Sequence, residues 1–408
     1  MVDFRQLADI YIIHTCSVTA VAEQKCKSAV KQAHRRNPFA KVAVIGCAAQ
    51  SNPEIFQRMP GVSWVLGNLE KFNLANILNQ PDHSYSSQPA MISAARKEVS
   101  DISKTKQFLP SYSMNDRTRS FFKVQDGCDY FCTFCSIPFM RGRSRSETIE
   151  NTLKVAREIA ATDIKEIVLT GVNIGDFGKQ YGERFIDLLR KLDELEDIRR
   201  LRISSVEPEL LSDEIIALVG KSKKLMPHFH IPLQAGTDKI LRLMKRKYTQ
   251  EVFADRVGKI RTHVPNACIA ADVIVGFPGE SEEDFKEAYR FIELQDISYL
   301  HIFTYSERPG TKALQFEGKI SETEKQRRSK KMHELSEKKK EDFYSRHLGY
   351  PFQVLWESNN VNGFMHGWTE NYIHCRTPFS PDLVNQITTV QLVEVKREKE
   401  LICDVTLL

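Results

Sequence analysis

Short apolar runs alternate with longer polar or amphipathic stretches along the chain. Three such runs fall near the N-terminus, at positions 10–13, 42–45 and 62–66. A Lys/Arg-rich helix is expected over residues 20–36, where Asn37 and Pro38 end it. Strands that alternate with helices predict a parallel sheet. We therefore expect residues 1–78 to form an α/β domain.

A second and longer series of apolar runs follows between residues 121 and 320. Six strands are expected at positions 121–124, 166–170, 200–204, 228–233, 269–275 and 299–304. Several are almost continuously apolar, which is typical of parallel strands buried on both faces. The helices between them include residues 148–160, 185–195, 238–247 and 281–294. Six units are too few for a closed eight-stranded barrel and predict an open (β/α)6 barrel, with its active site at the carboxyl ends of the strands.

The other segments differ from this alternation. A turn-rich, polar stretch predicts a linker. The run from Ser321 to residue 347 predicts one long basic helix, which either faces solvent or faces nucleic acid. Short strands with β-branched residues at the C-terminus predict a small antiparallel β-barrel. The expected domains are residues 1–78 (α/β), 79–120 (linker), 121–346 (open barrel with a closing helix) and 347–408 (small β-barrel).

Composition narrows the class of protein. In 408 residues, no apolar stretch approaches the ~20 residues that cross a bilayer, and the first residues lack a signal-peptide pattern. We therefore expect a cytoplasmic protein with no membrane partner. Nine cysteines in such a chain indicate metal binding or catalysis rather than disulfide bonds. The net charge of +5 is mild, and two basic runs, at 141–145 and 242–247, suit either a solvated face or phosphate contact.

Three cysteines form a short loop directly after the first strand of the expected barrel. Cys128, Cys132 and Cys135 stand in C-x-x-x-C-x-x-C order, with Phe134 before the last. Thiolates suit iron–sulfur clusters and zinc. A structural zinc site normally takes four protein ligands, whereas a four-iron cluster held by three would leave one iron open. The spacing favours the cluster over its alternatives, a zinc knuckle with a distant fourth ligand and three unrelated buried thiols.

The run from Gln125 to Arg145 resembles the signature of radical S-adenosylmethionine (SAM) enzymes, in their methylthiotransferase branch. The likeness extends from about Ala8 to the C-terminus. It implies that the three loop cysteines are catalytic and hold a [4Fe-4S] cluster, and it assigns Phe134 to the cofactor-binding residues. In that family the open iron binds the amino and carboxylate groups of SAM, and an electron from the cluster cleaves SAM to a 5′-deoxyadenosyl radical.

Polar residues and glycines follow the other strands of the expected barrel. The candidates for contact with SAM are Gly171, Asn173, Ser205, Glu207, Gln234 and Gly276. Singly, such residues usually just make a turn, but their recurrence at successive strand ends indicates a pocket. The resemblance places the methionine amino group near Gly171 and the adenine near Gly276. His228 and His230 alternate on one strand, and we expect them to pack or hydrogen-bond and not to bind metal.

Two further cysteines, Cys16 and Cys47, each follow a predicted strand in the N-terminal domain, so they share one rim of the sheet. The residues alone leave open a second metal centre or two small buried side chains. Their surroundings resemble two of the three motifs that hold an auxiliary [4Fe-4S] cluster in methylthiotransferases. The third motif would precede Cys16 by a few dozen residues. Either it lies in a missing N-terminal segment, which we expect, or the auxiliary centre of this chain is incomplete. Cys26 falls inside the predicted helix and is not expected to replace it.

The runs 125–129, 230–236 and 305–311 resemble most closely the branch that modifies N6-threonylcarbamoyladenosine in tRNA, just 3′ of the anticodon. This resemblance implies that one SAM methylates a sulfur at the auxiliary cluster, and that another is cleaved so that adenine C2 receives the methylthio group. Side-chain acid–base chemistry does not activate an adenine C–H, so the cofactor must supply the radical. The hairpin 363–372 is similar to that of the TRAM domain, an RNA-binding module.

The expected partners are a tRNA anticodon stem-loop, a flavodoxin- or ferredoxin-like electron donor and a sulfur source. The protein itself is expected to be a monomer. Two sister branches stay open as alternatives: one modifies isopentenyl-adenosine in tRNA, and the other modifies an aspartate of a ribosomal protein. An alternative of another class is a catalytically idle iron–sulfur protein that binds RNA.

Overall fold

The computed structural model describes residues 2–17, 19–79, 95–113 and 118–408 of the chain. They form two compact units, each of which combines segments that are distant in the sequence. The first unit consists of Met1–Lys106, Gly127–Arg143 and Ser306–Gln315, and the second holds the rest. The cysteine loop is therefore folded together with the N-terminal segment. Parts of the predicted linker, residues 80–94 and 114–117, lie outside the described residues, and the division into four domains stays a prediction.

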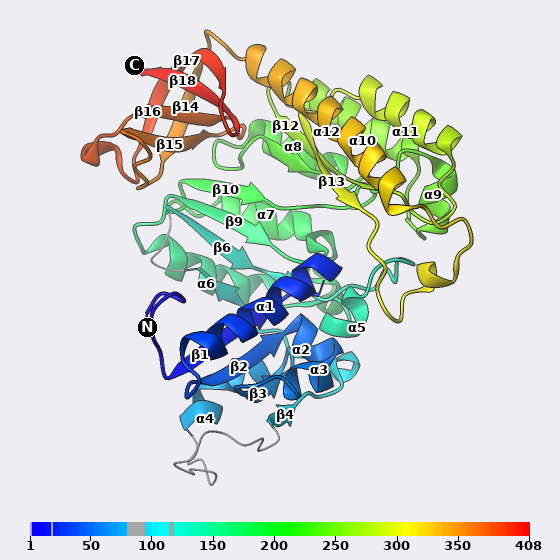
Figure 1. Cartoon of the computed structure of the whole chain (residues 1–408). Helices are drawn as coiled ribbons and strands as arrows, with labels where there is room; N and C mark the ends of the chain where they lie inside the picture. The colour runs from blue at the N-terminus through cyan, green and yellow to red at the C-terminus, as the bar shows by residue number, and fades with distance from the viewer. Residues whose placement is uncertain (1, 18, 80–94, 114–117) are drawn as a thin grey trace. The chain divides into compact units, whose positions relative to one another are not determined.

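The first unit is built on a parallel four-stranded sheet in the order β1-β2-β3-β4 (Figure 1), which confirms the expected α/β class. One face of the sheet packs on Val30, Phe56 and their neighbours from three helices, and the other packs on Ile77. The elements are β1 (Ile10–Thr15), α1 (Ala20–Arg36), β2 (Lys41–Gly46), α2 (Cys47–Ser51), α3 (Pro53–Gln57), β3 (Val62–Leu66), α4 (Leu74–Asn79), β4 (Arg96–Glu98) and α5 (Ile137–Arg141).

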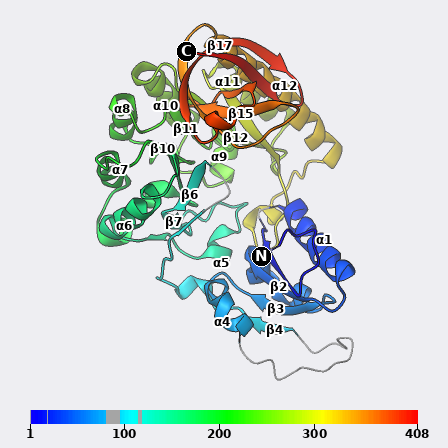
Figure 2. The same cartoon turned by 90° about the vertical axis from the view of Figure 1, so that its left-hand side faces the viewer.

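The second unit contains the six expected parallel strands, in two sheets that meet between β10 and β11. Isolated bridges, Leu201 with Leu225 and Ser205 with His230, join the two sheets. Figure 2 shows α6, α7 and α8 in an arc outside these strands. The prediction of an open (β/α)6 barrel is confirmed. Its strands are β6 (Arg119–Lys123), β9 (Glu166–Thr170), β10 (Arg200–Ile203), β11 (His228–His230), β12 (Cys268–Val275) and β13 (Tyr299–Thr304).

Helices cover the outer face of these strands. The main apolar core lies there, where Ile167, Leu201 and Ile269 pack against the helices. Alternate residues of the same strands, such as Glu166 and Arg202, are charged and almost fully buried on the opposite face. The helices are α6 (Ile149–Ala160), α7 (Phe185–Asp193), α8 (Asp213–Lys221), α9 (Asp238–Leu243), α10 (Gln250–His263), α11 (Glu282–Leu294) and α12 (Glu322–Ser345), and three short strands, β5 (Ser111–Tyr112), β7 (Gln125–Asp126) and β8 (Arg145–Ser146), accompany them.

The C-terminal strands close into a five-stranded barrel in the order β14-β15-β16-β18-β17, around a core that contains Trp356 and Met365. The predicted small barrel is confirmed, although β16 and β18 pair in parallel and the other neighbours are antiparallel. Its strands are β14 (Pro351–Trp356), β15 (Phe364–Thr369), β16 (His374–Pro378), β17 (Ile387–Arg397) and β18 (Leu401–Leu407). Within the described part of the chain, no helix combines the length and apolar character that a membrane span requires.

Candidate functional site

The cysteine loop of the first unit is held closed by its own backbone. The N–H of Cys128 donates to the carbonyl of Gly142 at 3.1 Å, and the N–H of Cys135 donates to that of Cys132 at 3.0 Å. Cys132 is buried, while Cys128 and Cys135 are half-buried, and none of the three is in a disulfide. The backbone thus presents three thiols, none of them in a disulfide, from one short loop.

Two glycines make this closure possible. Gly127 and Gly142 have φ values of +72° and +78°, in the left-handed region that side chains disfavour. A Cβ on Gly127 would collide with the carbonyl oxygen of Arg143, and a Cβ on Gly142 would lie 2.6 Å from that of Ile102. Both positions therefore need glycine for the close approach of backbone as well as for φ.

Replacing Gly127 by alanine is expected to lower the iron content of the reconstituted protein several-fold, because the loop must open to relieve the collision. Gly182→Ala is the matched control. Gly182 has the same φ of +72°, but nothing lies within 4 Å of its Cβ position. Both variants carry the left-handed strain of about 1–2 kcal/mol, and only Gly127→Ala carries the collision. Iron analysis after anaerobic reconstitution measures the difference; equal iron in the two variants would refute this role for Gly127.

An aromatic and cationic pair covers part of the loop. Phe131 adopts a φ of +50°, which is uncommon for a bulky residue. The guanidinium of Arg143 lies 4.6 Å from the centre of its ring, and Phe139 packs edge-on against it at 5.8 Å. Backbone strain of this kind is often kept at functional sites. Sequence reasoning singled out Phe134, which is half-buried in the same loop, but passed over Phe131.

Cys16 and Cys47 follow adjacent parallel strands, as expected. Thr15 of β1 pairs with Gly46 of β2, so the two cysteines directly follow paired residues. The hydroxyl of Thr15 donates to the carbonyl of Ile45 at 2.7 Å and accepts the N–H of Ala48 at 3.1 Å, which ties the two strand ends together. Cys47 is 3% exposed and Cys16 is exposed. The thiols therefore lie on one rim of the sheet.

Asn68, which the sequence did not single out, and Cys26, which was not expected to be a ligand, contact these cysteines. The side-chain amide of Asn68 lies 3.5 Å from the sulfur of Cys47 and donates to the carbonyl of Met140 at 2.9 Å. One buried amide thus connects Cys47 to α5, the helix that follows the cysteine loop. The N–H of Cys16 lies 3.4 Å from the sulfur of Cys26. Cys26 does lie inside α1, as predicted, but its thiol is placed beside Cys16.

In the second unit, Gln125 organises the loop after β9. Its side-chain oxygen accepts the N–H groups of Val172 and Asn173 at 2.9 and 2.8 Å. A Cβ on Gly171 would lie 2.9 Å from the same oxygen, so glycine permits this approach. Asn173 is 2% exposed and donates to Asp176, but its own amide oxygen is buried and accepts no hydrogen bond from the described residues. That oxygen is suited to accept a hydrogen bond from a bound ligand.

The loop after β10 places a carboxylate beside an arginine. Glu207 forms an ion pair with Arg246, whose guanidinium also donates to the hydroxyl of Tyr248 at 3.1 Å. Burial raises the pKa of Glu207, and Arg246 offsets part of that rise. Ser205 stands two residues earlier, where it bridges to His230. Glu207 is thus in place after β10 as predicted, but it already has a cationic partner.

The next two strands bring Gln234 and Gly276 to the same end of the barrel. Gln234 has a φ of +63°, an unusual value for a glutamine, and its N–H donates to the carbonyl of Asp272 at 2.8 Å. Gly276 has a φ of +75° and donates its N–H to Glu280 at 2.7 Å. A Cβ on Gly276 would collide with the side chain of Lys325. Whether these residues contact SAM stays a prediction.

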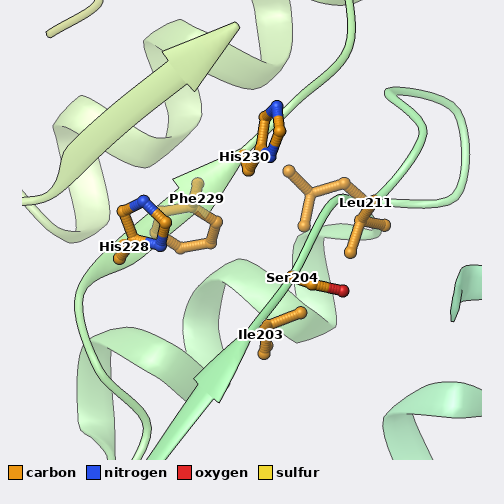
Figure 3. A pocket seen from close by; sticks show the side chains of 7 residues that line it. Ile203, Ser204, Leu211, His228, Phe229 and His230 are labelled. Carbon is orange, nitrogen blue, oxygen red and sulfur yellow. The ribbon is translucent and has the colours of Figure 1, made fainter. Parts of the chain in front are cut away.

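A small cavity lies between β10 and β11. Ser204, the residue before Ser205, is among the residues that line it. Figure 3 shows the side chains that line it, which include Ile203, Ser204, Leu211, His228, Phe229 and His230. His228 packs on the ring of Tyr372 at 4.6 Å and has no hydrogen-bond partner among the described residues. His230 is hydrogen-bonded to Asp272. The packing of His228 and the hydrogen bond of His230 agree with the roles expected for them from the sequence.

The basic runs are less exposed than their sequence indicates. Arg145 is 7% exposed and pairs with Asp126 at 3.4 Å, and the side chain of Arg246 is 4% exposed beside Glu207. In α12, Arg328 is buried against Glu280 at 2.7 Å. Arg143, in contrast, keeps 61% of its side chain exposed. Neither a solvated face nor phosphate contact therefore describes Arg145, Arg246 and Arg328, because each of them pairs with a carboxylate of the fold.

The donor groups fit the cofactors that the sequence implies. Three thiols on one glycine-closed loop, none of them in a disulfide, form a soft ligand set that leaves a four-iron cluster one ligand short. The orphaned oxygen of Asn173 and the left-handed Gln234 provide polar groups for a second ligand in the other unit. Cys16 and Cys47 form a second pair of thiols on one rim.

Comparisons with known proteins agree with this chemistry. A family model described as the radical SAM superfamily matches residues 122–292, and one described as uncharacterized protein family UPF0004 matches residues 1–67. The chain is 36% identical over 401 residues to the threonylcarbamoyladenosine tRNA methylthiotransferase MtaB of Bacillus subtilis, covering 96% of this chain and 87% of that protein.

A tRNA-2-methylthio-N(6)-dimethylallyladenosine synthase of Endomicrobium trichonymphae is 34% identical over 370 residues, covering 89% of this chain and 83% of that protein. Among solved structures, the radical S-adenosylmethionine methyltransferase TsrM of Kitasatospora setae aligns with a TM-score of 0.52 at 13% identity, over 73% of this chain and 62% of that one. The structural likeness shows a shared fold.

Proposed function

Because the chain belongs to the radical SAM methylthiotransferases, we propose that it adds a methylthio group to C2 of N6-threonylcarbamoyladenosine, just 3′ of the anticodon in tRNA. The cofactors are a [4Fe-4S] cluster and SAM, as in the family. The observation that carries the choice of substrate is the 36% identity, over 96% of the chain, to a protein named for that reaction.

Cys128, Cys132 and Cys135 would hold the cluster through their thiolates. When bound, the cluster supplies the electron that cleaves SAM. Residues of the second unit would bind and orient SAM. The side-chain oxygen of Asn173, which has no partner among the described residues, would accept a hydrogen bond from SAM, and Gln125 fixes the loop that carries Asn173. Ser205, Gln234 and Gly276 lie at neighbouring strand ends and form the rest of the proposed SAM pocket.

Cys16 and Cys47 would supply thiolates to a second, auxiliary cluster. Asn68 holds the thiol of Cys47 in place through its amide, and Thr15 holds the two strand ends together. Thiolates at this rim suit a sulfur-rich centre better than an oxygen-binding cation. We further propose a tRNA anticodon stem-loop as the substrate, with a flavodoxin- or ferredoxin-like electron donor and a sulfur source, for a monomer acting in the cytoplasm.

A second candidate substrate is dimethylallyladenosine in tRNA, because a synthase for its methylthio derivative is 34% identical over 89% of the chain. The two substrates differ in charge: threonylcarbamoyl ends in a carboxylate, and dimethylallyl is apolar. A site for the first needs a hydrogen-bond donor or cation for that carboxylate. Product analysis therefore separates the two assignments.

Mass analysis of tRNA nucleosides from cells that lack the gene tests the proposal. We expect 2-methylthio-N6-threonylcarbamoyladenosine to disappear and its precursor without the methylthio group to accumulate. Restoring the wild-type gene should restore the product, and restoring the Cys132→Ala gene should not. Loss of the dimethylallyl product would instead establish the second substrate. An unchanged nucleoside profile would leave the idle RNA-binding protein as the better account.

A further inference from the structure

Three polar side chains from neighbouring strands converge in the second unit. They are His230 at the end of β11, Asp272 in β12 and His301 in β13, and one potential ligand atom of each lies within 4.8 Å of the others. The Nε2 atom of His230 lies 2.7 Å from a carboxylate oxygen of Asp272, and the rings of His230 and His301 are 5.0 Å apart between centres.

Strand register brings these side chains to one face. Asp272 pairs directly with His301, and His230 pairs with Ala270, two residues before Asp272. The residues that flank them in each strand, such as Phe229, Val273 and Leu300, belong to the outer apolar core. Because side chains alternate along a strand, His230, Asp272 and His301 all point to the inner face of the open barrel.

The chemical character of this group is that of a metal site. Two imidazoles and one carboxylate are ligands that Zn²⁺ and neighbouring divalent metals take, and a site with three protein ligands keeps a position for water or another oxygen ligand. The side chains of His230 and Asp272 are 22% and 19% exposed, and His301 is exposed, so an ion can reach them. A hydrogen bond between His230 and Asp272 would account for two of the three side chains and leave His301 without a role. A metal ion would take all three side chains as ligands.

The group also lies next to the proposed SAM pocket in the same unit. The carbonyl of His230 accepts the N–H of Val206 at 3.0 Å, and the carbonyl of Asp272 accepts the N–H of Gln234 at 2.8 Å. The backbone that carries the three side chains is thus bonded to two of the strand-end loops. We propose that His230, Asp272 and His301 bind one divalent metal ion of the zinc class on the inner face of the barrel.

Zinc binding by the full-length, cluster-loaded protein tests the inference. After anaerobic dialysis against micromolar Zn²⁺, we expect one zinc per chain. X-ray absorption at the zinc edge should show imidazole and oxygen ligands with no sulfur. Asp272→Asn and His301→Phe should each weaken binding by roughly 100-fold or more, since loss of even an outer-shell partner costs 10–100-fold, while the iron content stays unchanged.

His263→Phe is the control, because His263 is an exposed histidine of α10 outside the group. It should bind zinc like the wild type. Wild-type protein that binds no zinc would overturn the inference, whatever the variants do. Zinc with sulfur ligands would overturn it too, because that signal places the metal on cysteines. Zinc affinity that the Asp272 and His301 variants leave unchanged would have the same consequence. None of these outcomes depends on which nucleoside the enzyme modifies.

Discussion

Cys132→Ala is expected to abolish the reductive cleavage of SAM. Cys132 is the most buried of the three loop thiols, at 8% exposed, and its loss leaves two protein ligands where the cluster needs three. The loop, residues 127–143, contains no fourth cysteine that could replace it. The measurement is 5′-deoxyadenosine released from SAM by the anaerobically reconstituted and reduced protein.

Cys375→Ala is the matched control for this prediction. Cys375 is also a buried thiol, but it lies in the core of the C-terminal barrel. We expect this variant to keep SAM cleavage, and both variants to keep the barrel folded when far-UV circular dichroism is recorded. Cleavage that survives in Cys132→Ala at the wild-type rate would show that the ligand assignment is wrong.

Glu166→Gln is expected to give the largest loss of stability, about 3–5 kcal/mol in the free energy of unfolding. Glu166 and Arg202 are both almost fully buried, with nitrogen–oxygen distances of 2.9 and 3.1 Å, and Arg200 lies 3.9 Å from the same carboxylate. Removing the carboxylate leaves two buried guanidinium groups without their anion. Urea denaturation at neutral pH measures the change.

The lowered pKa of Glu166 determines how this stabilisation depends on pH. Burial alone raises that pKa, but Arg202 and Arg200 outweigh burial and hold it below the ordinary value. The stabilisation is therefore present above the ordinary pKa of a glutamate and is lost as the pH falls through the lowered value. Asp187→Asn, which breaks an exposed pair with Arg184, is the control and should change stability little. A similar small loss in Glu166→Gln would contradict the account.

The barrel strands were predictable because parallel strands leave long apolar runs in the sequence. Positions 166–170 and 299–304 agree with β9 and β13 at both ends. The strand β4 was missed, because Arg-Lys-Glu has no apolar signal and is a strand only through its pairing with β3. The helices α8 and α10 were not among the expected helices, although Ser212 and Thr249, residue types that favour the start of a helix, cap them with side-chain hydrogen bonds.

The thiols of the candidate site were predictable from spacing, but their supporting contacts were not. Asn68 reaches Met140 across 72 residues of sequence, and Gln125 reaches Asn173 across 48. No local pattern encodes such pairs, because they depend on which loops the fold places side by side. The burial of Arg145 and Arg246 was missed for the same reason, since their carboxylate partners lie elsewhere in the sequence.

Spectroscopy of the reduced protein with and without SAM tests the central claim most directly. The double variant Cys16→Ala/Cys47→Ala isolates the loop cluster, because Cys128, Cys132 and Cys135 are its proposed ligands. After anaerobic reconstitution we expect iron with four-iron absorbance, and an electron paramagnetic resonance signal that changes when SAM is added. Zinc in place of iron, or a four-iron signal that SAM leaves unchanged, would contradict the assignment of these cysteines to a SAM-binding cluster.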